Sequence, residues 1–292
     1  MTDRLLSLPA VKEMLERAGT APRRSLGQNF VVDPNTVRRI ARLAGVRTGD
    51  RVVEVGAGLG SLTVALAATG AEVVAVETDG HLVPLLHEVV GSVTADAEPG
   101  GTTAGPVHVV HADARRMDWE ALLPGTGWHL VANLPYNIAT SVVLTVLDEV
   151  PAVTRLFVMC QREAAERLAA APGSGAYGAV SVRVAVHADA ELAGAVPATV
   201  FYPRPDVESA LVRIVRRAPS MRPDLRAEVS RLVTAAFAHR RQMLRRTLRS
   251  SFDDADRALV SAGVNPTDRP ERLGLADWVR LAEVSLATPV ES

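Results

Sequence analysis

The chain has 292 residues, of which 48% are hydrophobic and 22% charged, with a formal net charge of −1; this is ordinary for a globular protein of two domains. The single cysteine, Cys160, excludes an internal disulfide and a metal site built from several cysteines. No secretory signal and no membrane-spanning apolar run is visible, so a cytoplasmic protein without a membrane partner is expected.

Apolar residues first recur at helical spacing over 7–18, and a second helix is expected over 34–44, beginning at Asp33-Pro34. The polar segment 21–30 between them is interpreted as a loop. From Arg51 onward, short β-branched runs alternate with helical patterns. Strands are expected over 51–56, 71–78, 106–113, 128–135 and 154–161, and helices over 61–68, 80–90 and 138–149. Such alternation indicates a parallel sheet covered by helices on both faces.

The pattern changes toward the C-terminus. Residues 91–105, rich in Gly, Ala and Thr, are interpreted as a flexible surface insertion. Residues 179–188 and 207–216 are expected to be the last two strands, and the prolines between them favour an antiparallel return. After residue 218 only helical patterns follow, which are expected over 222–249, 254–263 and 276–287. The chain is therefore expected to divide into domains 1–217 and 218–292.

Glycines follow the first strand where a nucleoside cofactor commonly binds. The turn Gly56-Ala57-Gly58-Leu59-Gly60 allows a ligand close to the backbone, but such turns serve NAD, FAD, nucleotides and S-adenosylmethionine (SAM) alike, or no ligand at all. Glu77 ends the second strand, where a carboxylate can accept both hydroxyls of a ribose. Ser61 departs from the G-x-G-x-x-G spacing, which argues against NAD without excluding it. Asp113 ends the third strand and could accept a hydrogen bond from a cofactor's adenine amine, or act as a cap.

Asn133-Leu134-Pro135-Tyr136 ends the fourth strand and carries the most specific chemistry. The exocyclic amine of adenine is a poor nucleophile because its lone pair is delocalised into the ring. The Asn133 side-chain oxygen and the Leu134 carbonyl can accept hydrogen bonds from its two N–H groups. These bonds direct its lone pair toward a methyl donor. Pro135 restricts the backbone beside that carbonyl, and Tyr136 offers a ring to stack on the base. A simple strand-ending turn is the alternative, but these strand ends in register favour a binding site.

Five segments together resemble the KsgA family of ribosomal RNA adenine dimethyltransferases. The similarity covers most of the chain, and the combination is far more specific than the glycine turn. The segments are 26–30, 54–60, 133–136, 201–210 and 236–244. Two features depart from the family pattern: Gln242-Met243 stand where a basic residue usually follows the paired arginines, and the 91–105 insertion is longer than is typical.

The resemblance implies a Rossmann-like class I methyltransferase fold, with seven strands of which the last is antiparallel, and a small C-terminal α-helical domain. It implies SAM as cofactor, with Gln28 beside its methionine end. The implied cofactor-binding residues are Gln28, Asn29, Val31 (through its backbone), Gly56, Gly58, Glu77, Asp113 and Asn133. It also implies dimethylation at N6 of two adjacent adenosines in the 3′-terminal hairpin of 16S rRNA, within a 30S assembly intermediate.

Basic residues gather in one part of a nearly neutral chain. Residues 201–250 hold twelve arginines and four acidic residues, which predicts a basic face. On a continuous helix 241, 245 and 249 would share one face suited to RNA phosphates, although a merely solvated face is equally compatible. The expected RNA contacts are Arg23, Arg24, Arg204, Arg240, Arg241 and Arg245.

Other functions stay open at this point. The same chemistry could serve a macrolide-resistance methyltransferase that acts on 23S rRNA, and the chain could be an assembly factor that works mainly by binding. An NAD oxidoreductase would leave Asn133–Tyr136 unexplained. No metal is expected, because the histidine spacings do not match a zinc pattern, and a monomer is expected because no heptad pattern is present.

Overall fold

The computed structural model of the protein describes residues 5–94, 104–135, 138–218 and 221–287. The chain divides into two compact units: Met1–Ala165 with Leu192–Val215, and Glu166–Glu191 with Arg216–Ser292. This differs from the single division expected at 217/218. The C-terminal boundary lies close to the expected one, but the segment 166–191 belongs with the helical unit.

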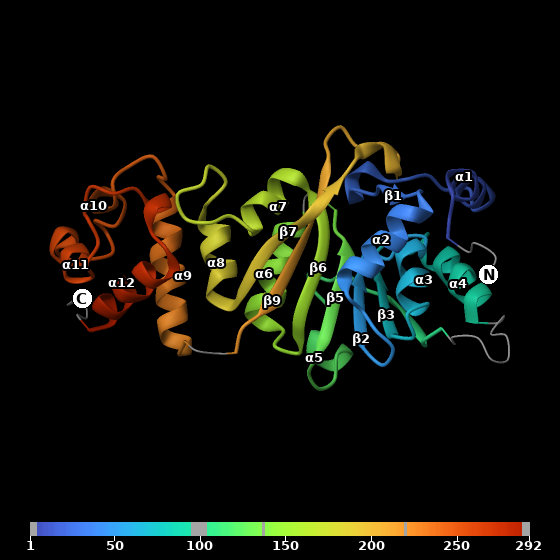
Figure 1. The fold of residues 1–292 in the computed structure, drawn as a ribbon, viewed down its shortest axis with the longest axis horizontal. Coiled ribbons are helices and arrows are strands. Elements are labelled where there is room, and N and C mark those ends of the chain that lie inside the picture. Colours follow the sequence, from blue (N-terminus) through green and yellow to red (C-terminus); the bar gives the residue numbers. More distant parts are fainter. Residues whose placement is uncertain (1–4, 95–103, 136–137, 219–220, 288–292) are drawn as a thin grey trace. The chain divides into compact units, whose positions relative to one another are not determined.

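Seven strands form one sheet, in the order β4-β3-β2-β5-β6-β9-β7 (Figure 1). They are β2 (Arg51–Val55), β3 (Glu72–Glu77), β4 (Val107–His111), β5 (Trp128–Asn133), β6 (Val153–Gln161), β7 (Ala188–Val196) and β9 (Ser209–Arg216). The strands from β4 through β6 pair in parallel, and β9 runs antiparallel to β6. The predicted α/β fold with an antiparallel last strand is confirmed. The central strands are rich in valine and leucine because they are buried on both faces.

The first unit also contains helices, most of which connect or follow these strands. They are α1 (Leu8–Arg17), α2 (Pro34–Ala44), α3 (Ser61–Ala67), α4 (Val83–Thr94), α5 (Trp119–Leu122), α6 (Ala139–Glu149) and α7 (Arg162–Leu168), whose last residues fall in the second unit. The start of α2 follows its sequence signal, because the Asp33 carboxylate accepts hydrogen bonds from the backbone N–H groups of Asn35 and Thr36. Helix α4 continues to Thr94, so the first residues of the expected 91–105 insertion are helical; residues 95–103 lie outside the described residues.

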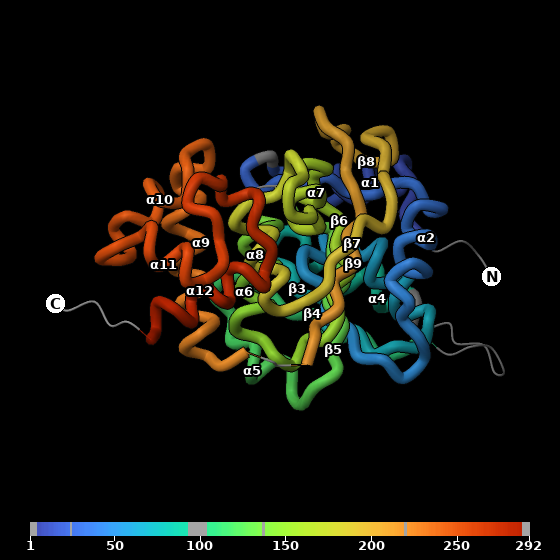
Figure 2. Tube along the Cα trace, turned by 60° about the vertical axis from the view of Figure 1, so that its left-hand side comes forward, coloured from blue at the N-terminus to red at the C-terminus, as the bar shows by residue number. Residues whose placement is uncertain are grey.

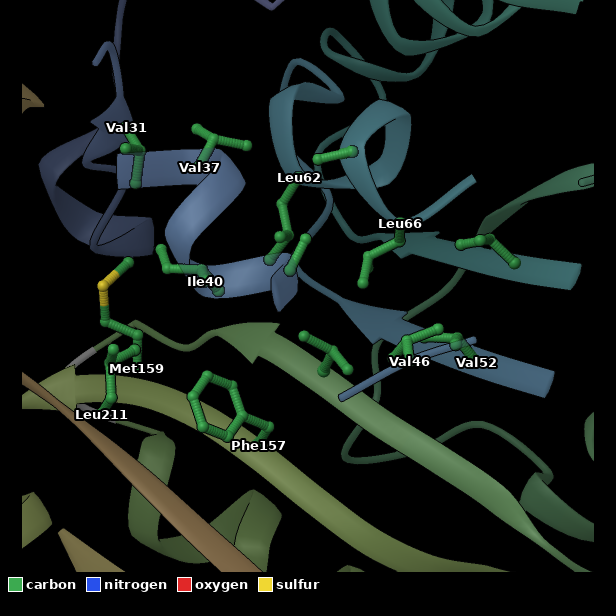
Figure 3. Close-up of a cluster of buried hydrophobic side chains, with 14 of the residues drawn as sticks. Val31, Val37, Ile40, Val46, Val52, Leu62, Leu66, Phe157, Met159 and Leu211 are labelled. Atoms are coloured by element: carbon green, nitrogen blue, oxygen red, sulfur yellow. The ribbon is translucent and has the colours of Figure 1, made fainter. Parts of the chain in front are cut away.

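One layer of apolar side chains fixes α2 and α3 on the sheet. Val37 and Ile40 from α2 meet Leu62 from α3, with Phe157 and Met159 of β6 beneath them (Figure 3). These side chains are almost completely buried. Burying them stabilises the layer by about 1.5–3 kcal/mol for each large side chain.

A second, two-stranded sheet holds the segment that precedes α2. Strand β1 (Phe30–Val31) pairs antiparallel with β8 (Phe201–Tyr202), and the Val32 N–H donates to the Val200 carbonyl at 2.8 Å. The expected loop 21–30 therefore contains a short 3₁₀ helix, η1 (Arg24–Leu26), and ends in a strand. This pairing places residues just before Phe30 beside the C-terminal ends of the central strands.

The second unit is helical. It contains α8 (Ala179–His187), α9 (Pro223–Phe237), α10 (Leu244–Thr247), α11 (Ala255–Ser261) and α12 (Leu275–Ala287), together with the 3₁₀ helix η3 (Pro270–Arg272). Figures 1 and 2 both show α9 through α12 gathered together. Trp278 is fully buried among them, and the buried Tyr177 hydroxyl donates to the Leu273 carbonyl at 2.8 Å.

Two sequence-based assignments in this part were wrong. Residues 179–188 form helix α8 rather than a strand, because Val182 and Val186, one helical turn apart, both pack into the core of the second unit. The helix expected over 222–249 ends at Phe237 and resumes only as α10. The Leu244 and Arg245 N–H groups bond the carbonyls of Asp268 and Pro266, so these tertiary bonds replace helical ones.

Candidate functional site

The ends of β2, β3, β4 and β5 open onto one cavity in the first unit, with about 1090 Å³ of empty space including its open mouth. The cavity brings together every described residue that the sequence nominated for cofactor or catalysis. They are Gln28, Asn29, Val31, Gly56, Gly58, Glu77, Asp113, Asn133, Leu134 and Pro135. Tyr136 lies outside the described residues.

The glycine turn after β2 has left-handed backbone conformations at Gly56, Gly58 and Gly60. Gly56 and Gly58 have φ angles of +75° and +58°, which disfavour any other residue. A Cβ on Gly58 would stand 3.2 Å from the Phe30 ring, so a side chain there would also push against β1. The Asn133 carbonyl oxygen would lie 3.6 Å from a Cβ on Gly56. The turn and the Asn133 motif are therefore direct neighbours in the lining of the cavity.

Two buried acids, Glu77 and Glu54, lie close to this turn. One Glu77 carboxylate oxygen accepts from the Gly58 N–H at 2.7 Å, and the other from the Asp79 N–H at 2.8 Å. Burial raises the pKa of Glu77, although these hydrogen bonds oppose the shift. Glu54 was not singled out from the sequence. It is 1% exposed and hydrogen-bonds the Thr63 hydroxyl at 2.5 Å, and burial raises its pKa to about 8.

Asn133 projects into the cavity with a defined amide orientation. Its Nδ2 group donates to the Asn29 carbonyl at 3.1 Å, so its Oδ1 is the atom left to accept a hydrogen bond from a ligand. The Leu134 N–H donates to the Met159 carbonyl at 2.9 Å, and this bond fixes the Asn133–Leu134 peptide against β6. Among the described residues none donates to the Leu134 carbonyl oxygen. The two acceptors proposed from the sequence are thus both present at the end of β5.

Asp113 lines the same cavity but is already held by a neighbour. The Arg115 guanidinium contacts both carboxylate oxygens, at 3.0 and 2.7 Å, and the Arg115 N–H also bonds one of them. These hydrogen bonds lower the pKa of Asp113, so the carboxylate is charged at neutral pH. A charged carboxylate is an acceptor only, which suits an amine donor on a ligand.

The segment before β1 is fastened to the cavity by a residue that the sequence reading missed. Asp79 accepts from Gln28 Nε2 at 2.8 Å, and its other oxygen lies 3.4 Å from the Arg23 guanidinium. Gln28 in turn accepts from the Arg23 backbone N–H at 2.7 Å. Both the backbone and the side chain of Arg23 therefore contact the protein. The only sequence signal for Asp79 was an acid two positions after Glu77.

The other arginines expected to contact RNA fall into two groups. Arg240 is used inside the second unit, where it donates to Glu271 at 2.9 Å and to the Gly175 carbonyl at 2.8 Å. Arg204, Arg241 and Arg245 are exposed. Residues 241 and 245 were expected on one face of a continuous helix. Because α9 ends at Phe237, they do not share such a face. The side chain of Arg24 lies outside the described residues.

Among the described residues, no group of three or more His, Cys, Asp or Glu side chains could hold a metal ion. Within the same ranges, none of the helices combines the length and apolar character needed to cross a bilayer.

Comparison with known proteins gives consistent results. The family model described as "Ribosomal RNA adenine dimethylase" matches residues 19–286. "Ribosomal RNA small subunit methyltransferase A" from Leifsonia xyli subsp. xyli is 46% identical over 283 residues, 96% of this chain and 98% of that protein. The protein of the same name from Thermobifida fusca is 47% identical over 283 residues, 96% of each.

Solved structures share the fold. A dimethyladenosine transferase from Plasmodium falciparum has a TM-score of 0.70 at 20% identity and covers 85% of this chain and 94% of that one. The 23S rRNA methyltransferase ErmE has a TM-score of 0.63 at 26% identity, covering 87% of this chain and 98% of its own.

Proposed function

The chain belongs to the ribosomal RNA adenine dimethylase family, and we propose that its substrate is small-subunit rRNA, in which it dimethylates N6 of two adjacent adenosines in the 3′-terminal hairpin. Family membership confirms the expected activity, that of a SAM-dependent rRNA adenine dimethyltransferase. The choice of subunit follows the relatives at 46% and 47% identity, whose names specify the small subunit, rather than the 23S enzyme at 26%.

The orientation of Asn133 is the observation that carries the proposed mechanism. Its Nδ2 atom is committed to the Asn29 carbonyl, so Oδ1 faces the cavity that it shares with the Gly56 turn. A methyl acceptor and a methyl donor can therefore meet in the same cavity. An asparagine buried in packed protein, away from the Gly56 turn, would have excluded this mechanism.

The residues around the cavity fit SAM. Each Glu77 carboxylate oxygen accepts one backbone N–H in the structure and retains capacity to accept a ribose hydroxyl. Asp113 is the expected acceptor for the adenine amine of the cofactor, and Asn29 and Val31 line the same cavity. When bound, SAM supplies a methyl group on a positively charged sulfur, which departs as a neutral thioether. The glycine turn admits such a ligand because it carries no side chains at Gly56 and Gly58.

The chain's own groups prepare the target amine. Asn133 Oδ1 and the Leu134 carbonyl accept hydrogen bonds from the two N6–H groups, which favours a pyramidal nitrogen whose lone pair points toward the donor. After the methyl group is transferred, the cationic N6 loses one proton to water. Pro135 limits the backbone freedom of the peptide that carries this second acceptor. Orientation of this kind can supply much of the rate enhancement for a transfer between two bound groups. Stacking of the base on Tyr136 stays a prediction from the sequence.

We assign RNA contacts first to Arg204, Arg241 and Arg245, because they are exposed and carry no ion pair among the described residues. Arg23 and Arg240 already serve protein contacts, so their part in RNA binding is secondary. Exposed arginines near a nucleic acid bind phosphates and make the affinity dependent on salt. The protein is proposed to act as a monomer on an assembling small subunit in the cytoplasm.

The test is mapping of the methylated nucleotides. Purified protein with labelled SAM is incubated with small subunits that lack the modification and, separately, with large subunits, and mass spectrometry locates the methyl groups. Two adjacent dimethyladenosines in small-subunit rRNA are expected. Methylation of 23S rRNA alone would assign the chain to the macrolide-resistance type of enzyme instead.

Asn133→Ala tests the mechanism within the same assay. Loss of one acceptor and of the bond to Asn29 should lower kcat by about 10²-fold or more while SAM still binds. The matched control is Asn35→Ala, at an exposed asparagine on α2 outside the cavity. An Asn133→Ala enzyme with wild-type kcat would refute the role assigned to this residue. A methylation-dead variant that still supports subunit assembly in cells would point to an additional binding role.

A further inference from the structure

Asp79 occupies a central place in the network behind the cavity, although it does not line the cavity itself. Its side chain is 2% exposed, on the turn between β3 and α4. One carboxylate oxygen accepts from the His81 N–H at 3.1 Å, and the other accepts from Gln28 Nε2 at 2.8 Å. A buried carboxylate requires such partners, so the contact with Gln28 is part of what keeps this charge stable inside the protein.

The hydrogen bond between Asp79 and Gln28 links two groups of the site, Glu77 and Asn133. On one side, the Asp79 backbone N–H donates to Glu77, the residue proposed to hold the ribose. On the other, Gln28 is followed directly by Asn29, whose carbonyl accepts from Asn133 Nδ2. Asp79 thus connects the cofactor acid to the asparagine that orients the target amine, through hydrogen bonds of ordinary length.

We propose that Asp79 is a positioning residue that fastens the Gln28–Asn29 segment, which lines the cofactor cavity, and so fixes the amide of Asn133. The proposal rests on the proposed roles of Glu77 and Asn133. The neighbouring Arg23 contributes less to the fastening, because its 3.4 Å ion pair involves a half-exposed guanidinium. The Gln28 hydrogen bond is the essential contact, since it joins a buried charge to a side chain of the segment itself.

Exchanging the hydrogen-bond donor at Gln28 and the acceptor at Asp79 by mutation distinguishes this role from simple capping of the β3–α4 turn. Asp79→Asn can still accept from His81 N–H, but its amide then faces the amide of Gln28, donor against donor. Gln28→Glu alone places a carboxylate against the Asp79 carboxylate. The double variant restores one donor and one acceptor, and a glutamate at 28 can still accept from the Arg23 N–H.

SAM affinity is measured by calorimetry without RNA, together with hydrogen exchange of the peptide covering residues 23–29. Each single variant should bind SAM about tenfold more weakly or worse and lose protection in that peptide. The double variant should return to within about threefold of wild type. The proposal is overturned if both single variants bind SAM like wild type. It is also overturned if the fold-loss of SAM affinity in the double variant equals the product of the fold-losses in the two single variants. Gln28→Ala tests the same contact should Asp79→Asn fail to fold.

Turnover on RNA is then compared with these binding data. We expect kcat to fall in both single variants and to recover in the double variant, because the Asn133 amide depends on the Asn29 carbonyl. Glu88→Gln, at an exposed acid on α4, is the control and should change neither quantity. Since SAM binding and hydrogen exchange need no RNA, a wrong assignment of the RNA substrate would leave this result intact, and additive losses would overturn only the role of Asp79.

Discussion

Replacing Glu54 with glutamine should remove much of the pH dependence of stability in the first unit. Glu54 is 1% exposed on β2, and burial raises its pKa from 4.5 to about 8. The folded state therefore keeps a proton that the unfolded chain has already released at pH 6. The stability that this proton contributes is fully present below pH 4.5 and is lost as the pH rises through 8.

The size of the effect follows from the two pKa values. Linkage gives a loss of about 2 kcal/mol in the free energy of unfolding between pH 6 and pH 8 from this group alone. Glutamine is neutral throughout this range and can still hydrogen-bond the Thr63 hydroxyl. The stability of Glu54→Gln relative to wild type should therefore rise by about 2 kcal/mol from pH 6 to pH 8. The pKa of Glu77 is also raised and gives both proteins a pH dependence of the same sign, and the Glu77 charge itself adds to the raised pKa of Glu54.

Urea denaturation without SAM is the assay, because a bound ligand would add its own pH dependence. Trp119 and Trp128 lie in the first unit and Trp278 in the second, so a Trp278→Phe background makes fluorescence report the first unit alone. Glu16→Gln, at an exposed glutamate on α1, is the matched control and should follow wild type. Parallel pH curves for wild type and Glu54→Gln would refute the reasoning.

The remaining predictions concern RNA binding and the glycine turn. Arg241→Ala should weaken RNA binding and reduce the steepness of its salt dependence by about one phosphate contact, whereas Arg240→Ala should chiefly lower the stability of the second unit; equal salt dependences for both would contradict this division. Gly58→Ala should lower the unfolding free energy by about 1–2 kcal/mol and weaken SAM binding, because φ is +58° and the Phe30 ring must move. Gly49→Ala, at φ +83° with open space around it, should show the backbone strain without loss of SAM affinity.

Local patterns in the sequence were sufficient for the parallel strands of the sheet and for most of the cavity wall, but not for strand β7. Short runs of valine and leucine identified the parallel strands because both faces of such strands are covered. Gly56, Glu77, Asp113 and Asn133 each stand at or just beyond a strand end, and the ends of neighbouring parallel strands meet at one edge. The start of α2 was equally local, because Asp33 supplies its own cap.

Tertiary packing decided what these patterns could not. Residues 179–188 alternate valine with other residues, as a strand would, yet 179–187 form α8 because the buried Val182 and the partly buried Val186 both pack into the core of the second unit. The long helix expected over 222–249 is interrupted because the Leu244 and Arg245 N–H groups find carbonyl partners beyond residue 265. The pairing of β1 with β8 joins residues about 170 apart, and the contact of Asp79 with Gln28 joins two others far apart in sequence. Sequence spacing determines which residues share an element's face, whereas contacts between distant segments exist only once the chain has folded.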